Sequence, residues 1–405
     1  MRICYIADAT SPHTRGFLLN LTKCKFNNEI IVISTRYCSD YCIGSAKVIN
    51  ISSYPGIKHT PRSSRDLLIK WIYGSVINPK IISLLGGLAY FIDYQRLTKK
   101  VCRLVNELQP DIVHGIRLHL EGALASATGH HTVASTVWGH EFVLYSRYSI
   151  MLNHLFRKSL KKIDLIITDN TRDTRLAFQL GLAQESLSYV MPSQGGVDLS
   201  VFHPINRREA KVALGLDPNR PLIASIRGFV TAIIRTDILV QAIPLVLKQV
   251  PQAQFLIHGG TKHVGLNKLE SLSKALNVQN AVHFTTGPTN NVAKYLKASE
   301  VFVSVASFDG VPMSMLEAMA CGCIPVMSDF DSIQEWIEHG QNGYLFDPNN
   351  PSILAQSILM ALNCNLEKIR RINEQQLIER ANPTVNLSRM LQIYEELTTK
   401  RHRGI

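Results

Sequence analysis

The sequence has no hydrophobic run long enough to cross a membrane. Its longest one, Ile81–Ile92, has about a dozen residues, whereas a spanning helix needs about 20. No N-terminal segment combines a basic start, an apolar centre and a small-residue cleavage site, and Met1–Ala7 already has the pattern of a strand. We therefore expect a cytoplasmic protein, either free or peripheral at the inner face of the membrane.

Paired cysteines and a dinucleotide fingerprint are also absent. None of the eight cysteines forms a C-x-x-C pair, so we expect no zinc site and interpret the thiols as reduced and buried. The first polar loop, Ser11–Gly16, lacks G-x-G-x-x-G, so no nicotinamide cofactor is expected. The sequence predicts a protein that works without a cofactor.

Acidic residues are outnumbered by basic ones, 31 against 43, which gives a formal net charge of +12. Such a balance favours an anionic partner: nucleotide phosphates, anionic lipid or nucleic acid. The sequence has no long Lys/Arg run and no nucleic-acid-binding signature, so we expect no nucleic acid partner.

Residues 56–100 are the basic part of the first half, with eight Lys or Arg against two acids. Trp71, Tyr73 and Tyr90 are interleaved with them, a pattern typical of an amphipathic stretch on an anionic membrane surface. The alternative is a pair of core-facing helices with one solvated face.

The length of 405 residues is too great for one hydrophobic core and fits two domains. Short apolar strands such as Arg2–Ala7 and Ile30–Ser34 alternate with helical patterns, which predicts parallel sheets with helices on both faces. We predict an α/β protein with domains at 1–200 and 201–382 and a last helical segment at 383–405.

The most informative stretch is Ser304–Ser328. An apolar strand at 301–305 leads through a loop with Gly310 and Pro312 into helix-forming residues at 313–320. Gly322 stands where a left-handed helix C-cap is expected, and 324–327 resume an apolar strand.

Two acids are placed around the start of this helix: Asp309 in the loop and Glu317 on the helix. A helix N-terminus offers unpaired N–H groups to a phosphate, while carboxylates can accept hydrogen bonds from ribose and sugar hydroxyls. Together they describe a nucleotide-sugar site. The alternative is an ordinary strand–helix–strand crossover whose two acids are solvated.

The motifs Asp309-Gly310-Val311-Pro312 and Leu316–Val326 (LEAMACGCIPV) resemble the signature of the family 4 retaining glycosyltransferases, with Asp where the family usually has Glu. The resemblance is strong over 301–347 and looser over 1–200. It implies the GT-B fold: two Rossmann-like domains facing a central cleft, with the final helix crossing back to the first domain. It also implies retaining, metal-independent transfer of a sugar of the hexose type from a nucleotide-sugar to the hydroxyl of a saccharide or lipid-linked acceptor, in polysaccharide or glycolipid synthesis.

The resemblance assigns roles to individual residues. It places Arg227 and Arg235 on the donor diphosphate, Glu317 on the ribose, and Asp309 on the donor sugar with the backbone of Gly310, Val311 and Pro312. His119 and His140, which follow two predicted strands of the first domain, become candidates for positioning the acceptor and the sugar. Without the resemblance, we would interpret each arginine as surface charge.

Three alternatives remain open at this point. A nucleotide-sugar epimerase shares the fold, and a non-catalytic nucleotide-sugar-binding protein would fit the unusual Asp309. Asp329-Phe330-Asp331 has the spacing with which other glycosyltransferases hold a divalent cation. We interpret it as a polar loop and expect no metal.

Overall fold

The structure is a computed structural model that describes residues 1–24, 28–51, 79–139, 141–229, 233–261, 265–287 and 291–402. These residues form two compact units. Of the described residues, the first contains those up to Ile51, Lys80–Gly196 and Asn382–His402, and the second contains Pro79 and Val197–Ala381. The first unit is therefore built from chain segments on both sides of the second.

The first unit contains, among its described residues, an eight-stranded sheet in the order β3-β4-β2-β1-β5-β6-β7-β8. All neighbours pair in parallel except β3 and β4. The strands are β1 (Arg2–Ala7), β2 (Glu29–Ser34), β3 (Cys42–Ile43), β4 (Ala46–Asn50), β5 (Ile112–Ile116), β6 (Val133–Val137), β7 (Leu165–Thr168) and β8 (Leu187–Val190).

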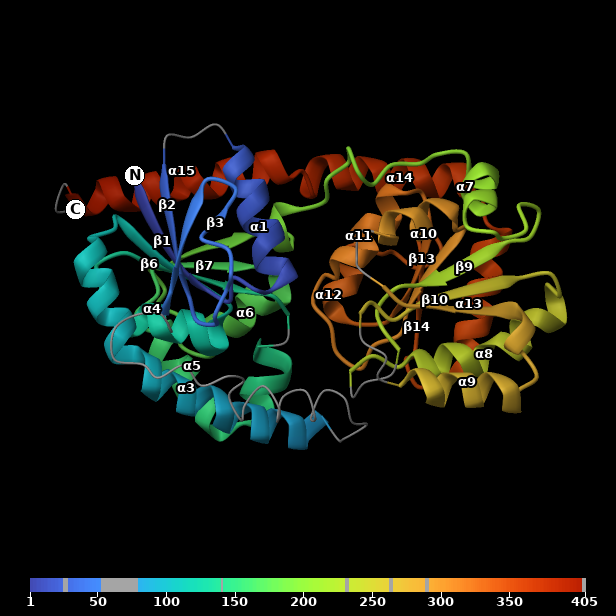
Figure 1. Ribbon diagram of the computed structural model, residues 1–405, viewed down its shortest axis with the longest axis horizontal. Helices are drawn as coiled ribbons and strands as arrows, with labels where there is room; N and C mark the ends of the chain where they lie inside the picture. Colours follow the sequence, from blue (N-terminus) through green and yellow to red (C-terminus); the bar gives the residue numbers. More distant parts are fainter. Residues whose placement is uncertain are drawn as a thin grey trace. The chain divides into compact units, whose positions relative to one another are not determined.

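Side chains alternate between the two faces of this sheet, and each face carries its own core. Cys4 and Ile6 of β1 belong to the core beneath α3 (Pro79–Leu108), α4 (Ala123–Ala127), α5 (Ile150–Leu160) and α6 (Thr171–Gln179). Ile3 and Tyr5 face α1 (Pro12–Lys23) and α15 (Pro383–His402) instead. Figure 1 shows α15 beside α1 along this sheet, so the last helix completes the first unit.

The second unit contains, within the part that the structure describes, a six-stranded parallel sheet in the order β11-β10-β9-β12-β13-β14. Its strands are β9 (Leu222–Ser225), β10 (Gln254–His258), β11 (Val282–Thr285), β12 (Val301–Ser304), β13 (Ile324–Ser328) and β14 (Tyr344–Phe346). The runs are nearly continuous in apolar residues because both faces are covered.

Helices cover both faces of the second sheet (Figure 1). One face packs against α8 (Thr236–Gln249), α9 (Leu266–Ala275) and α13 (Pro351–Asn363). The other packs against α7 (Arg207–Ala213), α10 (Val292–Ala298), α11 (Met313–Ala320) and α14 (Leu366–Arg380). The short α12 (Asp331–Gln334) follows β13.

Gly87 lets α3 approach the start of α5 closely. A Cβ built on Gly87 would lie 2.0 Å from Oγ of Ser149, the N-cap that accepts a hydrogen bond from the Leu152 amide. This packing holds one face of α3 on the first unit.

The opposite face of α3 carries the α3 apolar stripe, four exposed side chains three or four residues apart: Ile81, Leu84, Leu88 and Ile92. Exposed Arg96, Lys99 and Arg103 follow on the same helix. None of the helices formed by the described residues is long and apolar enough to cross a membrane. Residues 52–78, which include much of the basic region noted in the sequence, lie outside the described residues.

The predicted fold class is confirmed. Both units are α/β with parallel sheets, and the last helix packs on the first unit. The stretch Ser304–Ser328 forms strand, loop, helix and strand as predicted, and Gly322 has the left-handed φ of 76° expected of a C-cap. Pro312 stands just before α11 with extended backbone rather than in its first turn, because its ψ is 128°.

Candidate functional site

The first polar group to consider follows the carboxyl ends of β9 and β12, neighbouring strands of the second sheet. Arg227 comes two residues after β9, and Asp309 lies in the loop between β12 and α11. In open parallel sheets, ligands bind outside the carboxyl ends of the strands, where the loops lead into the N-termini of the helices. The fold therefore brings a base and an acid, far apart in sequence, to the edge where a ligand is expected.

Arg227 and Asp309 form a nearly buried ion pair. Nη2 of Arg227 lies 2.7 Å from Oδ2 of Asp309, and the two side chains are 15% and 8% exposed. Glu317, on α11, belongs to the same charge group: burial raises its pKa to about 7, and the positive charge of Arg227 opposes that rise. Arg227 thus interacts electrostatically with both acids singled out in the sequence.

Arg235 reaches the same edge by a different route. Residues 233–235 pair with 305–307: Ile234 bridges Ala306 in antiparallel register, and the Arg235 amide donates to the Val305 carbonyl over 3.0 Å. Its guanidinium is held by Asp237, with Nε and Nη2 each 3.0 Å from a carboxylate oxygen. This hydrogen bonding raises the pKa of Arg235. Both arginines therefore carry a carboxylate partner.

The backbone of Gly310, Val311 and Pro312 is buried beside the pair. The Gly310 amide donates to Oδ1 of Asp309 over 3.0 Å, and the Val311 side chain packs into the core around α11. Proline has no N–H, so Pro312 contributes only shape and its carbonyl.

A second polar group lies at the carboxyl edge of the first sheet, after β5 and β6. His119 belongs to a short π-helix, η2 (Leu118–Gly122), and Glu141 begins another, η3 (Glu141–Ser146). Oε1 of Glu141 lies 3.5 Å from Nε of Arg117 and 3.7 Å from Nδ1 of His119. The Trp138 amide donates to Oε2 over 3.2 Å.

Glu141 is fully buried yet ionised. Burial alone would raise the pKa of its carboxyl, but the contact with His119 and the charge of Arg117 lower the pKa to about 2. The His119 ring, itself 3% exposed, stacks on Tyr145 with 5.6 Å between ring centroids. Arg117 holds a left-handed φ of 79°, an uncommon conformation for a residue with a side chain. Such strain is typical of functional sites.

The other histidine predicted for this edge, His140, lies outside the described residues. The preceding residue, Gly139, is held from α6: Arg172 pairs with Asp173 at 3.0 Å and donates to the Gly139 carbonyl over 3.4 Å. Asp173 is buried, which raises its pKa. The loop that carries His140 is thus anchored by α6 at its preceding residue.

Sequence reasoning missed Glu141, Asp237 and Arg172 as site residues. Glu141 follows His140 directly at a predicted strand end, so its position could have been noticed. Its contacts with Arg117 and His119 could not, because those residues follow a different strand. Asp237 follows Arg235 by two residues, but that spacing alone does not distinguish an ion pair from solvated charges. The Arg172–Gly139 contact joins loops after different strands and has no local signal.

No group of three or more His, Cys, Asp and Glu side chains suited to a metal occurs among the described residues. Asp329 follows β13 directly, and its Oδ1 accepts a hydrogen bond from Gln334 over 2.7 Å. Asp331 is the first residue of α12. The Asp-x-Asp spacing therefore belongs to a strand–helix connection.

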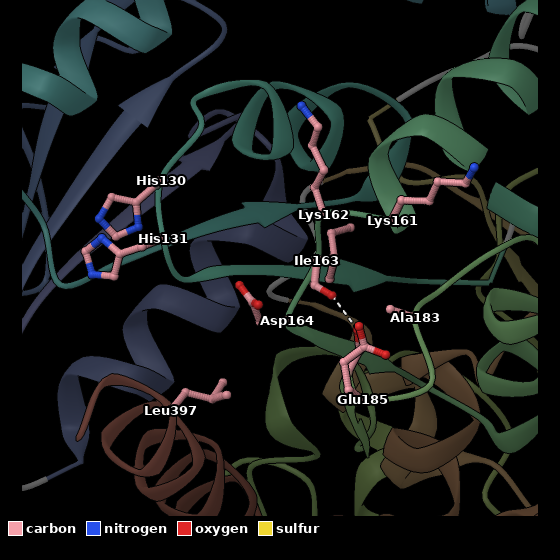
Figure 2. A pocket seen from close by; sticks show the side chains of 10 residues that line it. His130, His131, Lys161, Lys162, Ile163, Asp164, Ala183, Glu185 and Leu397 are labelled. Carbon is pink, nitrogen blue, oxygen red and sulfur yellow. Dashed lines mark hydrogen bonds between the residues drawn. The ribbon is translucent and has the colours of Figure 1, made fainter. Parts of the chain in front are cut away.

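A cavity of about 410 Å³ in the first unit lies away from both polar groups. Its walls come from residues before β6, β7 and β8, at the amino ends of these strands, and from Leu397 of α15. Figure 2 shows the rings of His130 and His131 side by side, with centroids 4.2 Å apart. Lys161 and Lys162, which also line it, are exposed. The cavity lies at the amino ends of the strands, whereas the polar group of the same sheet lies at their carboxyl ends, so it is not part of the candidate site.

Comparison with known proteins identifies the class. Residues 206–382, in the second unit, match the family model described as glycosyl transferases group 1. Residues 78–170, in the first unit, match the model described as glycosyl transferase 4-like. The chain is therefore an α/β glycosyltransferase. It belongs to the glycosyl transferases group 1 family.

Individual relatives are distant. An uncharacterized glycosyltransferase of Haemophilus influenzae is 25% identical over 282 residues, 67% of this chain and 72% of that protein. A D-inositol 3-phosphate glycosyltransferase of Mycolicibacterium vanbaalenii is 28% identical over 169 residues. That alignment covers 38% of this chain and 36% of the relative, so the chain spans only about a third of its length.

Solved structures show the same fold over nearly the whole chain. Sucrose-phosphate synthase from Thermosynechococcus elongatus has a TM-score of 0.75 at 15% identity and covers 99% of this chain and 100% of its own. HepE from Anabaena, solved with UDP-glucose, has a TM-score of 0.71 at 15% identity and covers 98% and 100%. These neighbours have the GT-B fold, which supports the predicted fold class.

Proposed function

We propose that this glycosyltransferase moves a sugar from a nucleotide-sugar to an acceptor hydroxyl with retention of configuration and without a metal ion. The observation that carries the proposal is the nearly buried group of Arg227, Asp309 and Glu317 at the carboxyl edge of the second sheet. The structural neighbour HepE has been solved with UDP and with UDP-glucose, which supports a nucleotide-sugar donor here.

Arg227 and Arg235 are proposed to bind the donor diphosphate. A guanidinium fork matches two phosphate oxygens, and its charge persists throughout the pH range of the enzyme. When the bond from the sugar to the diphosphate breaks, negative charge grows on the departing oxygen. Two arginines at that position stabilise this negative charge, a role that a metal ion has in other enzymes.

Glu317 and Asp309 are proposed to bind the neutral parts of the donor. Glu317 has a pKa near 7, so both of its protonation states occur at neutral pH. The ionised form can accept hydrogen bonds from ribose hydroxyls, and the protonated form can also donate one. Asp309 contacts the donor sugar, with the 310–312 backbone lining the same place. The longer acid, Glu317, is thus assigned to the ribose hydroxyls, and the shorter one, Asp309, to the hydroxyls of the donor sugar.

The acceptor side is proposed to lie at the first sheet's polar edge. His119, held by Glu141 and stacked on Tyr145, and His140 position the acceptor hydroxyl and the sugar. We propose a saccharide or lipid-linked acceptor in polysaccharide or glycolipid synthesis. A relative named poly(glycerol-phosphate) alpha-glucosyltransferase, from Bacillus subtilis, is 30% identical over 121 residues, 30% of this chain and 18% of that protein.

The proposal is tested with the full chain and UDP-, GDP- and ADP-sugars. One donor class should raise the midpoint of thermal unfolding, since a ligand that binds only the folded state stabilises it. With a matching acceptor, that donor should give transferred sugar and free nucleoside diphosphate in equal amounts. Conversion of the donor sugar to its epimer without such release would make the protein an epimerase, and binding without turnover by any acceptor would make it a binding protein.

We also propose peripheral attachment at the cytoplasmic face of the membrane through α3. The α3 apolar stripe and the basic residues that follow it combine apolar area with positive charge, and the chain carries +12 overall. The full chain should sediment with vesicles of phosphatidylglycerol and phosphatidylcholine more than with phosphatidylcholine alone. Leu84→Ser with Leu88→Ser should weaken this binding, while Leu19→Ser, at an exposed position on α1, should not. Equal sedimentation of all three proteins would exclude α3 as the contact.

A further inference from the structure

Arg227 has two competing partners in the proposed function. Its guanidinium is engaged by Asp309 at 2.7 Å, and both side chains are nearly buried. Asp309 takes Nη2, the nitrogen that both bidentate forks of a guanidinium share. A phosphate that binds Arg227 bidentately therefore has to displace Asp309 from Nη2.

The acid of this pair is the fixed member. Oδ1 of Asp309 accepts from the Gly310 amide over 3.0 Å, and the Asp309 carbonyl accepts from Oγ of Ser332 over 2.9 Å. The same loop is pinned near its start, where the Ala306 amide donates to Oγ of Ser328 over 3.0 Å. Arg227 is attached by a long, unbranched side chain and is the more exposed of the two. A change of partner therefore requires movement of the arginine only.

Charge makes the exchange consequential. The Asp309 carboxylate neutralises Arg227, and Glu317, whose pKa is about 7, adds partial negative charge at neutral pH. An arriving diphosphate meets this negative charge, and like charges at short distance repel. The acid that holds Arg227 should thus weaken the binding of a bare nucleoside diphosphate.

We propose that Asp309 is an exchangeable partner of Arg227, which holds the guanidinium until a donor binds and then releases it to the donor diphosphate. The freed carboxylate then becomes available to the donor sugar. When a nucleotide-sugar binds, the displaced Asp309 loses its ion pair with Arg227 but gains hydrogen bonds from the sugar. A nucleoside diphosphate, the product, has no sugar to offer Asp309 these hydrogen bonds. Asp309 therefore favours donor over product. This inference rests on the proposed nucleotide-sugar function.

The test compares nucleoside diphosphate affinity with turnover. Asp309→Asn keeps the side-chain shape and an oxygen for the Gly310 amide but removes the charge. Its affinity for UDP, GDP or ADP, whichever binds the wild type, should rise about three- to tenfold in titration calorimetry, while turnover of the matching nucleotide-sugar falls. Glu367→Gln is the matched control, since it breaks an exposed pair with Arg371 in the same unit, and should change neither quantity. In Arg227→Ala with Asp309→Asn, the gain in affinity should disappear.

The outcomes separate the two proposals. If the wild type binds none of the three nucleoside diphosphates and turns over no donor, the proposed function fails. If it binds one, and Asp309→Asn binds it equally or more weakly, the exchange is overturned while the donor site stands. A crystal structure of the wild type with that diphosphate gives an independent reading should the variant fold poorly. Arg227 should contact phosphate and lie more than about 4 Å from the Asp309 carboxylate; an unbroken pair beside the bound diphosphate refutes the exchange.

Discussion

Oε1 of Glu141 lies 3.5 Å from Nε of Arg117, and the glutamate side chain has no exposure to solvent. A buried carboxylate is stable only when charged or polar groups compensate for its lost hydration. Here Arg117, His119 and the Trp138 amide do so. The pair joins the loops after β5 and β6 at the edge proposed for the acceptor.

Replacement of Glu141 by alanine should destabilise the first unit strongly. It leaves Arg117 and His119 without the carboxylate that they surround, and the free energy of unfolding should fall by about 3–5 kcal/mol. Urea denaturation followed by circular dichroism measures this loss. Glu29→Ala, which breaks the exposed pair with Arg2, should cost at most about 1 kcal/mol. A similar cost for both variants would contradict the role given to Glu141.

The same carboxylate should shape the acid limb of stability. The pKa of Glu141 in the folded protein is about 2, below the ordinary 4.5, so its ionised form stabilises the fold above pH 4.5. This contribution is lost as the pH falls from about 4.5 to 2, because the unfolded state then binds the proton first. The stability gap between the wild type and Glu141→Gln should accordingly narrow across that window. A gap that stays constant would mean that the charge of Glu141 is not what stabilises the site.

Removal of Arg227 or Glu317 should impair donor turnover more than folding. Arg227→Ala and Glu317→Ala should each reduce kcat/KM for the nucleotide-sugar at least about tenfold, the loss expected for one charged contact. Steady-state kinetics measures the loss, and thermal unfolding checks that the variants remain folded. Arg371→Ala, at an exposed position on α14, serves as the control. Wild-type turnover in both site variants would remove these residues from the donor site.

Glu317 should also give stability the opposite pH dependence to Glu141. Its pKa is raised from 4.5 to about 7, so between these values the folded state holds a proton that the unfolded state has lost. Stability should therefore fall as the pH rises from about 4.5 to 7. Glu317→Gln mimics the protonated form and should flatten this part of the curve. Unfolding midpoints in urea across pH 5 to 8 provide the measurement, and parallel curves for the two proteins would rule out the raised pKa.

The attachment of α15 depends on a buried polar contact between Tyr394 and His114. The Tyr394 hydroxyl is hydrogen-bonded to Nδ1 of His114, and burial lowers the pKa of His114 to about 3, so its ring is neutral. Tyr394→Phe removes the hydroxyl and leaves the ring nitrogen without it, which should cost about 1–3 kcal/mol. Denaturant unfolding tests this, with Tyr41→Phe as the control because Tyr41 is 77% exposed. An equal effect of the two changes would show that the contact adds no stability.

Much of the fold could be predicted because its signals are local. Apolar strands that alternate with helical patterns indicate parallel sheets. The residue pattern from Val301 to Ser328 predicts strand, loop, helix and strand in the order that the structure has. Asp309 and Glu317 could be found for the same reason, since both belong to that run. Their partner Arg227 was expected at a strand end, and the adjacency of β9 and β12 puts it 2.7 Å from Asp309.

The rest depends on contacts between distant segments. Arg235 follows Arg227 by eight positions, and only the pairing of 233–235 with 305–307 explains how Arg235 reaches the same edge. The charge state of Glu141 follows from Arg117 and His119, which lie on a loop after another strand. Spacing along the chain contains no information about such encounters.

The course of the chain through its two units sets an order on biosynthesis. All of the second unit that follows Pro79 is the one segment Val197–Ala381, whereas the first needs α15, whose Leu387, Met390 and Tyr394 fill its core. Domains fold as their segments leave the ribosome. The second unit can thus reach its native state before α15, which completes the core of the first unit, has been synthesised. A ribosome that stops before α15 releases a protein with an intact second unit and an open core in its first.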